Sequence, residues 1–255
     1  MKKLNRVLVL LVIAVLAIPQ ISFSQGISIH TYRRVAPENM EEYLKRETTY
    51  WQKFAQSEIQ KGNMYFWAIF QKVGGTHMEK SPNILIINGI SDIDKGVNWS
   101  GITELFPGVA MEDIETTSLF TTTDQILVQD LPNHIQVENP QFNYVHIIYH
   151  NVVNTDAHLA FEADEWKPML QKAMDEGKTT VQGWGNGRIM SPQSEDFPYT
   201  AYSYDLFGTA KDALGSYFSE MVVPDNFGAS VADNTAGPRK SNLYRIVAAA
   251  TTGME

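Results

Sequence analysis

The sequence of 255 residues contains no cysteine. Disulfide bonds, thiolate nucleophiles and metal sites with cysteine ligands are therefore excluded. Small exported domains usually depend on disulfides, but a chain of this length can bury enough apolar surface to fold without them. Positive charge is also scarce, because 20 Lys and Arg against 29 Asp and Glu give a net charge of -9. An acidic surface repels phosphate groups, so we expect neither nucleic acid nor a membrane surface as a partner.

Long hydrophobic runs are missing outside the N-terminal region. In the N-terminal region, two lysines and Arg6 precede an apolar segment at residues 7–18. Ser24 is a small residue at the position where a signal peptidase would cut. This pattern predicts a cleaved secretory signal peptide over residues 1–24, and hence a periplasmic or secreted protein that has no membrane contact after cleavage. The apolar run is shorter than the ~20 residues that span a bilayer, which argues against a membrane anchor.

The rest of the chain alternates strand-like and helix-like patterns, and Gly62 and Gly177 are placed as helix stops. Pro168 lies inside one helical pattern and predicts a kink or a break there. Residues 132–141 read as a linker, and residues 223–238 as a long loop. We expect strands at residues 26–35, 64–73, 83–90, 125–128, 142–153, 179–190, 199–207 and 243–249, and helices at 37–61, 92–105, 111–120, 155–176 and 209–218.

The same order of elements occurs twice. Trp51 precedes Gly62 by 11 residues, and Trp166 precedes Gly177 by 11. Each copy reads β-α-β-β-α-β, which is the ferredoxin-like unit, an antiparallel sheet with helices on one face. We therefore expect an α+β protein with a first ferredoxin-like repeat at residues 25–131 and a second at residues 142–255. The alternative is two unrelated α+β halves.

Tandem units of this kind, with an aromatic first helix and a tryptophan on the second strand, resemble the dimeric α/β-barrel superfamily. That superfamily includes antibiotic-biosynthesis-type monooxygenases, EthD and NIPSNAP-like domains and haem-degrading monooxygenases. The resemblance implies that the two repeats pack sheet to sheet as a pseudo-twofold α/β barrel within one chain, as a monomer or a homodimer. Function varies widely on such folds, so the resemblance implies little about activity.

Catalysis would depend on His146 and Glu162. Glu162 lies on a helix beside Trp166, and a carboxylate among aromatic rings can act as a general base. His146 and His150 share one face of a strand but lie ~13 Å apart along it, so no shared metal is expected. The structural alternatives are that Glu162 lies on a solvated helix face and that His146 and His150 are ordinary half-exposed histidines.

A ligand between the two sheets would need an apolar wall with a few polar groups. Arg188 would anchor an anionic ligand, or would simply pair with a carboxylate such as Glu162 or Asp205. His146 and Arg188 would orient the ligand through polar contacts. The predicted ligand-binding residues are Trp67, Tyr144, Trp184, Arg188, Tyr202 and Tyr204.

Three functions remain open at this level. The first is an exported protein that binds a small, largely apolar ligand between its sheets. The second is a monooxygenase-like enzyme, either cofactor-free or haem-dependent, and the third is a structural or partner-binding domain with a filled barrel. The sequence identifies no cofactor and no substrate.

Overall fold

The computed structural model describes residues 26–75, 81–215, 218, 220–223 and 227–252. The signal peptide expected at residues 1–24 lies outside this part of the chain. Within the described part, no helix combines the length and the apolar character that crossing a bilayer requires.

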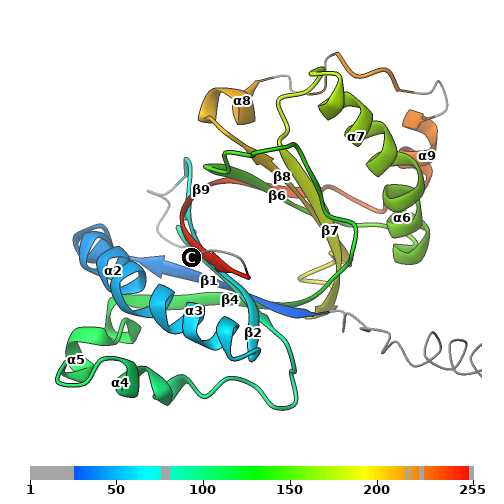
Figure 1. Ribbon diagram of the computed structural model, residues 1–255. Helices are drawn as coiled ribbons and strands as arrows, with labels where there is room; N and C mark the ends of the chain where they lie inside the picture. Colours follow the sequence, from blue (N-terminus) through cyan, green and yellow to red (C-terminus); the bar gives the residue numbers. More distant parts are fainter. Residues whose placement is uncertain (1–25, 76–80, 216–217, 219, 224–226, 253–255) are drawn as a thin grey trace, which may run out of the picture.

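Nine strands form one sheet in the order β4-β1-β3-β2-β9-β6-β8-β7-β5, and every pairing is antiparallel. Because β4 also pairs with β7, eight of these strands close into a barrel, and the short β5 extends the sheet beside β7. Figure 1 shows this ring of strands end on. The strands are β1 (Ile27–Val35), β2 (Met64–Lys72), β3 (Ile84–Ile90), β4 (Phe120–Asp130), β5 (Ile135–Gln136), β6 (Tyr144–His150), β7 (Gly183–Ser191), β8 (Ala201–Phe207) and β9 (Lys240–Thr251).

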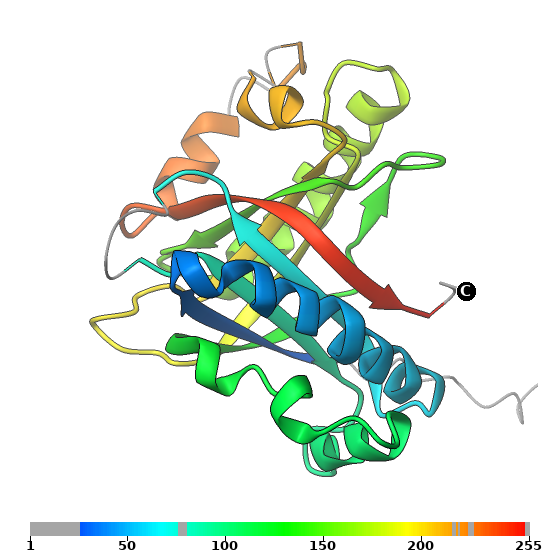
Figure 2. The same cartoon turned by 90° about the vertical axis from the view of Figure 1, so that its left-hand side faces the viewer.

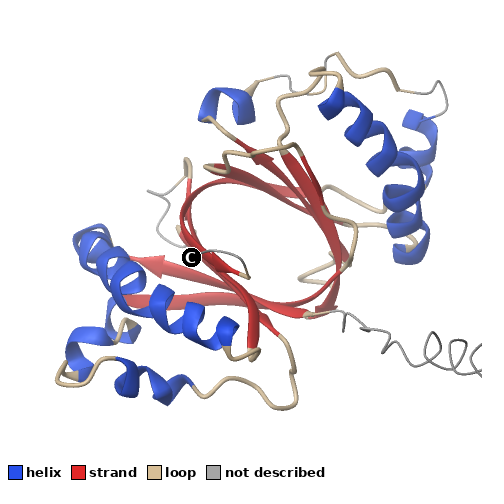
Figure 3. Cartoon of the chain, in the orientation of Figure 1, coloured by secondary structure: helices blue, strands red, loops and turns tan. Residues whose placement is uncertain are grey.

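Helices cover the outside of the barrel in two groups on opposite sides (Figures 2 and 3). In each group the longest helical stretch contains one π-helical turn, named η2 in the first half and η5 in the second. The first group is η1 (Pro37–Asn39), α2 (Met40–Arg46), η2 (Glu47–Trp51), α3 (Gln52–Gln60), η3 (Trp99–Gly101), α4 (Ile102–Leu105), α5 (Met111–Ile114) and η4 (Thr117–Leu119). The second group is α6 (Thr155–Phe161), η5 (Glu162–Trp166), α7 (Lys167–Asp175), α8 (Ala210–Leu214) and α9 (Phe227–Asp233).

The structure differs from the sequence expectations in several loops. Residues 132–141, expected as a linker, contain β5, and residues 223–238, expected as a loop, contain α9. Pro168 does not break its helix, because it lies in the first turn of α7, directly after the π-helical turn. The Lys167 N–H bonds to the Glu162 carbonyl five residues earlier, so the regular hydrogen-bond ladder is already shifted at the point where the proline lacks an N–H.

Three apolar layers follow from the closed sheet. The barrel interior holds one cluster, centred on residues such as Tyr149 and Ile147 of β6. A second cluster fills the space between the first half of the sheet and helices α2 and α3, and a third lies between the second half and α7. Because side chains alternate between the two faces of each strand, one set enters the barrel interior and the other set meets the helices where they cover the sheet.

The glycine run of β7 gives the barrel room for aromatic rings. A Cβ atom on Gly185 would lie 2.3 Å from the hydroxyl oxygen of Tyr204, and one on Gly187 would lie 2.4 Å from the ring of Tyr202. These glycines face the interior and allow the two tyrosines to pack against the bare backbone.

One buried histidine in the barrel gives a pH prediction. The ring nitrogens of His30 lie 3.2 Å from the Tyr149 hydroxyl and 3.2 Å from the Ser28 hydroxyl, and burial lowers the pKa of His30 to about 3. Between its ordinary pKa and pH 3, the unfolded chain binds a proton there that the folded chain does not. Stability should therefore fall as the pH drops below about 6.5.

The variant His30→Gln should reduce this acid dependence by up to ~1.4 kcal/mol per pH unit. Urea denaturation at several pH values between 7 and 4.5 measures the slope, with His134→Gln, at an exposed position, as control. An unchanged slope in the His30 variant would contradict the prediction.

Candidate functional site

Two cavities in the described part of the chain have a size suited to small molecules. One, called here the outer pocket, has a volume of about 410 Å³ and lies between the second half of the sheet and helices α6 and α9. The other, the barrel cavity, has a volume of about 470 Å³ and lies between the strands. Both fall in the size range of ligand pockets, and both are lined largely by apolar side chains.

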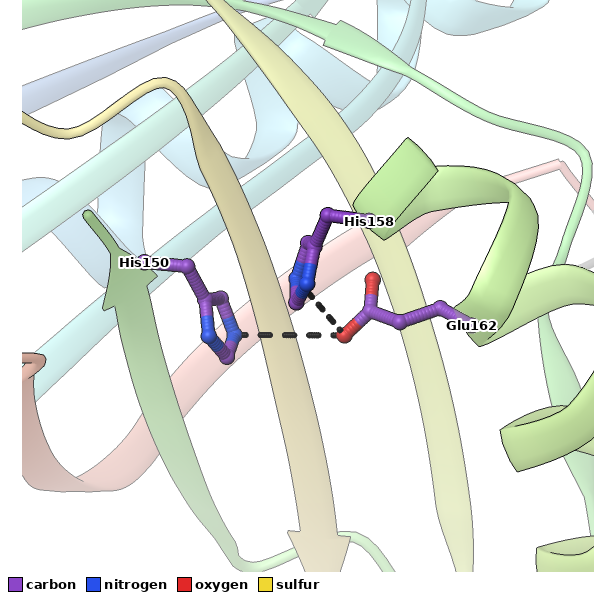
Figure 4. A group of neighbouring side chains, drawn as sticks. All are labelled: His150, His158 and Glu162. Carbon is purple, nitrogen blue, oxygen red and sulfur yellow. Dashed lines mark ion pairs between the residues drawn. The ribbon is translucent and has the colours of Figure 1, made fainter. Parts of the chain in front are cut away.

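The outer pocket carries a cluster of three polar side chains (Figure 4): His150 from the end of β6, His158 from α6 and Glu162 from the start of η5. Glu162 Oε1 lies 3.4 Å from His158 Nε2 and 3.9 Å from His150 Nε2. The centres of the two imidazole rings are 4.7 Å apart. Three elements that follow one another in the sequence thus direct three side chains to one point.

Local sequence explains how α6 places its share of the cluster. The side chain of Asn154 caps the helix by accepting a hydrogen bond from the Ala157 N–H at 3.0 Å. His158 and Glu162 then lie four residues apart, so they are neighbours on one face of the helix. That face is turned towards the end of β6, where His150 lies (Figure 4).

Hydrogen bonds hold the cluster in place. Asn186 of β7 donates a hydrogen bond from Nδ2 to Glu162 Oε2 at 2.8 Å, which leaves Oε1 facing the histidines. Asn186 in turn accepts a hydrogen bond from Asn133. On the other side, His150 Nε2 lies 2.7 Å from the hydroxyl of Ser203. In contrast, Nε2 of His158 is buried and makes no hydrogen bond.

Burial shapes the electrostatics of the outer pocket. Burial, with smaller contributions from His158 and Arg239, lowers the pKa of His150 to about 3, so this imidazole is neutral at pH 7. Burial and the charge of Glu162 raise the pKa of Asp205 to about 7. Asp205 of β8 therefore combines access to the pocket with a proton affinity matched to neutral pH.

The barrel cavity has a different polar group. Asp130, at the end of β4, accepts hydrogen bonds from the hydroxyls of Tyr65 and Tyr202. Burial raises the pKa of this carboxyl, although the two hydroxyls favour its charged form. The surrounding wall is apolar and includes Tyr204, whose hydroxyl lies 3.1 Å from the ring of His134.

The structure divides the sequence-predicted ligand wall between two faces of the sheet. Tyr202 and Tyr204 line the barrel cavity as expected for a site between the sheets. Tyr144, Trp67 and Trp184 belong instead to the clusters between sheet and helices. The prediction that these three line a cavity between the sheets is wrong, because odd and even positions of a strand point to opposite faces and both faces are apolar here.

The predicted polar residues also separate. Glu162 lies in the outer pocket. His146 is on the outer face of β6, where its ring packs against Phe207 at 5.8 Å, so its predicted place in a cavity between the sheets is wrong. Arg188 forms an ion pair with Asp156 of α6, not with Glu162 or Asp205, and it lines neither cavity.

Sequence reasoning missed His158 and Asp205. The spacing of His158 and Glu162, four residues apart on a predicted helix, was a usable signal for the first of them. Nothing in the local sequence distinguishes Asp205 within its strand, because its position depends on the partner strands. His150 was considered only with His146, and the structure pairs it with a helix instead.

Comparison with known proteins identifies the fold but assigns the chain to no family. No protein-family model matches the sequence, and no curated protein sequence matches it either. A candidate monooxygenase from Lactobacillus acidophilus NCFM has a similar structure, with a TM-score of 0.53, 13% identity, and 89% of this chain and 96% of that chain covered. For an anthrone oxidase-like protein the TM-score is 0.54 at 12% identity, with 91% and 95% covered.

A third similar structure is a candidate monooxygenase from Fusobacterium nucleatum subsp. nucleatum, with a TM-score of 0.52, 9% identity, and 91% of this chain and 97% of that chain covered. At such identities the likeness concerns the fold alone. The chain, a closed antiparallel barrel flanked by helices, therefore shares its overall fold with these three proteins.

Proposed function

We propose that this protein is a monooxygenase-like enzyme that acts on a small, largely apolar molecule in the outer pocket. The observation that carries the proposal is the convergence of three buried polar side chains, His150, Glu162 and Asp205, and the partly buried His158 on an otherwise apolar pocket of about 410 Å³. Buried polar groups of this kind cost stability and are typical of functional sites. The monooxygenase-like fold neighbours support the choice of reaction class.

Asp205 is the proton acceptor in this proposal. An apolar substrate with an acidic methylene group would lose a proton to Asp205, and the histidine–glutamate cluster would orient the polar atom next to that carbon. The substrate anion then reacts with dioxygen, so that CH2 and O2 become C=O and H2O with no external reductant. The raised pKa of Asp205 suits this role, because the carboxylate binds a proton near neutral pH.

Anthrone in air is a suitable probe of this reaction, because it carries such a methylene group. The wild-type protein should accelerate oxygen uptake and anthraquinone formation, and Asp205→Asn should lose on the order of 100-fold of that acceleration. Asp130→Asn is the matched control, since it changes the buried carboxylate of the barrel cavity instead. No acceleration by the wild type, or equal rates in the wild type and Asp205→Asn, would reject the proposal.

A second candidate is a small apolar ligand held between the sheets, favoured by the barrel cavity of about 470 Å³ with Tyr202 and Tyr204 in its wall. Quenching of tryptophan fluorescence by anthrone reports binding without turnover. Ala249→Phe would fill the barrel cavity and leave the outer pocket intact. Loss of quenching in Ala249→Phe but not in Asp205→Asn would favour this candidate.

The proposal includes a tandem origin of the barrel. The strand orders β4-β1-β3-β2 and β9-β6-β8-β7 follow the same pattern, in agreement with two ferredoxin-like repeats. Each half also carries a π-helical turn that runs from a glutamate to a tryptophan, at Glu47–Trp51 and Glu162–Trp166. A barrel closed within one chain is compatible with a monomer or a homodimer.

Export is part of the proposal as well, on the basis of the pattern at residues 1–24. Mass spectrometry of the protein from the periplasmic fraction or the medium should find a chain that starts near Gln25. A full-length chain confined to the cytoplasm would contradict export.

A further inference from the structure

We propose that His150, His158 and Glu162 bind one divalent transition-metal cation at the inner end of the outer pocket. The proposal deepens the proposed function, because it concerns the same pocket. Metal binding is measured without substrate, however, so either proposal can fail while the other stands.

The geometry of the three ligand atoms is close to that of an assembled site. All three lie within 4.8 Å of one another, and Glu162 Oε1 is 3.4 Å and 3.9 Å from the two histidine nitrogens. A cation with bonds of about 2.0–2.2 Å keeps neighbouring ligand atoms roughly 3 Å apart. Small rotations of the side chains would therefore complete the coordination.

The charges also favour a cation. Glu162 and Asp205 are buried carboxyl groups that line the same pocket. Arg239 also lines the pocket, but among the described residues no ion pair links a lysine or an arginine to Glu162 or Asp205. The corresponding carboxylate of the first half, Glu47, is paired with Arg33 at 2.9 Å. The second half thus has a carboxylate in the same structural position with two imidazoles where the first half has a guanidinium.

The hydrogen bonding of His158 and Glu162 also fits the role of metal ligands. His158 Nε2 is buried and has no hydrogen-bond partner, as expected for a nitrogen whose lone pair is reserved for a cation. Asn186 fixes Glu162 through Oε2 and leaves Oε1 free, which is the arrangement of an outer-shell group behind a metal ligand. His150 Nε2 would have to exchange its contact with the Ser203 hydroxyl for the metal.

The donor set indicates the class of metal. Two imidazoles and one carboxylate suit iron(II), manganese(II), cobalt(II) or zinc(II), whereas calcium and magnesium prefer oxygen ligands. Three protein ligands leave coordination positions open, and all three line the pocket. A cation there would face the apolar walls formed by Ile148, Phe161 and Trp184, where a substrate oxygen could bind it.

Calorimetric titration of chelator-treated, untagged protein with cobalt(II) or zinc(II) tests the proposal. The wild type should bind one equivalent, and cobalt(II) should give visible d–d absorption bands. His158→Ala and Glu162→Gln should each weaken binding by at least about 100-fold, and Asn186→Ala by about tenfold. Ser203→Ala should bind as tightly as the wild type or more tightly, because it frees His150.

The control is His134→Ala, which removes a histidine outside the outer pocket and should leave binding unchanged. Circular dichroism verifies that each variant is folded. An absence of one-to-one binding in the wild type would overturn the proposal. So would binding in His158→Ala and Glu162→Gln that equals the wild type, because the contact between His158 and Glu162 would then be only structural.

Discussion

Replacing Arg33 with methionine is expected to lower the free energy of unfolding by roughly 3–5 kcal/mol. Arg33 lies on β1, and its guanidinium group contacts Glu47 Oε1 at 2.9 Å and the Tyr43 hydroxyl at 2.8 Å. Only 3% of the Glu47 side chain and 18% of the Arg33 side chain are exposed. Without its partner, the Glu47 carboxylate would remain buried without a compensating positive charge.

The pKa of Glu47 shows why the partner matters. Burial raises this pKa, even though Arg33 and the Thr116 hydroxyl act in the opposite direction. Desolvation therefore has the larger effect on the Glu47 carboxylate. The ion pair with Arg33 offsets this desolvation cost and adds no net stability beyond it. The double variant Arg33→Met/Glu47→Gln should recover a large part of the loss, because it removes both charges together.

A double-mutant cycle measured by urea denaturation tests this. A coupling energy below about 0.5 kcal/mol between positions 33 and 47 would show that the pair acts independently. Glu162→Gln provides the matched comparison in the second half. It removes a buried carboxylate that has no arginine or lysine partner, so in the metal-free protein it should be neutral or stabilising.

Replacing Trp67 with alanine is expected to cost about 3–5 kcal/mol of stability and to leave anthrone binding unchanged. Trp67 of β2 is 2% exposed, and its ring packs in the cluster between the sheet and helices α2 and α3. It lines neither the outer pocket nor the barrel cavity. Its removal would leave a void among side chains that cannot close around it.

Urea denaturation followed by circular dichroism measures this effect, because the substitution removes a fluorophore. Trp99→Ala is the matched control, since the Trp99 side chain is 41% exposed and should lose much less stability. Binding is compared by equilibrium dialysis with anthrone below the denaturation range. If a folded Trp67→Ala protein loses most of its anthrone binding, the prediction is contradicted and Trp67 belongs to the ligand site.

Much of the element order could be read from the sequence. Helix stops at Gly62 and Gly177 are real, and both glycines have positive φ angles, 76° and 66°. The strand patterns were correct in type, but β4, expected only at residues 125–128, runs over Phe120–Asp130. Other errors in length lie in segments with little periodicity. Segment 92–105 is an example, since only Trp99–Gly101 and Ile102–Leu105 are helical there.

The position of the candidate site could be predicted only in part. Glu162 was singled out because it lies on a helix beside an aromatic residue, and the structure places it in the outer pocket. Its partners could not be found by the same reasoning. His150 comes from a strand and Asp205 from a neighbouring strand, so their proximity depends on the pairing of β6 with β8.

The sequence by itself determined the absence of cysteine chemistry, the acidic charge, and the alternation of strands with helices whose faces are apolar. Only the tertiary structure decided which face of each strand became the interior. On β6, the residues Val145 and Ile147 are apolar on one face, while Tyr144 and Ile148 are apolar on the other. When both faces of a strand are apolar, the pattern does not predict which face becomes the interior. Closure of the barrel through β4 and β7 therefore decided which side chains line the cavity and which meet the helices.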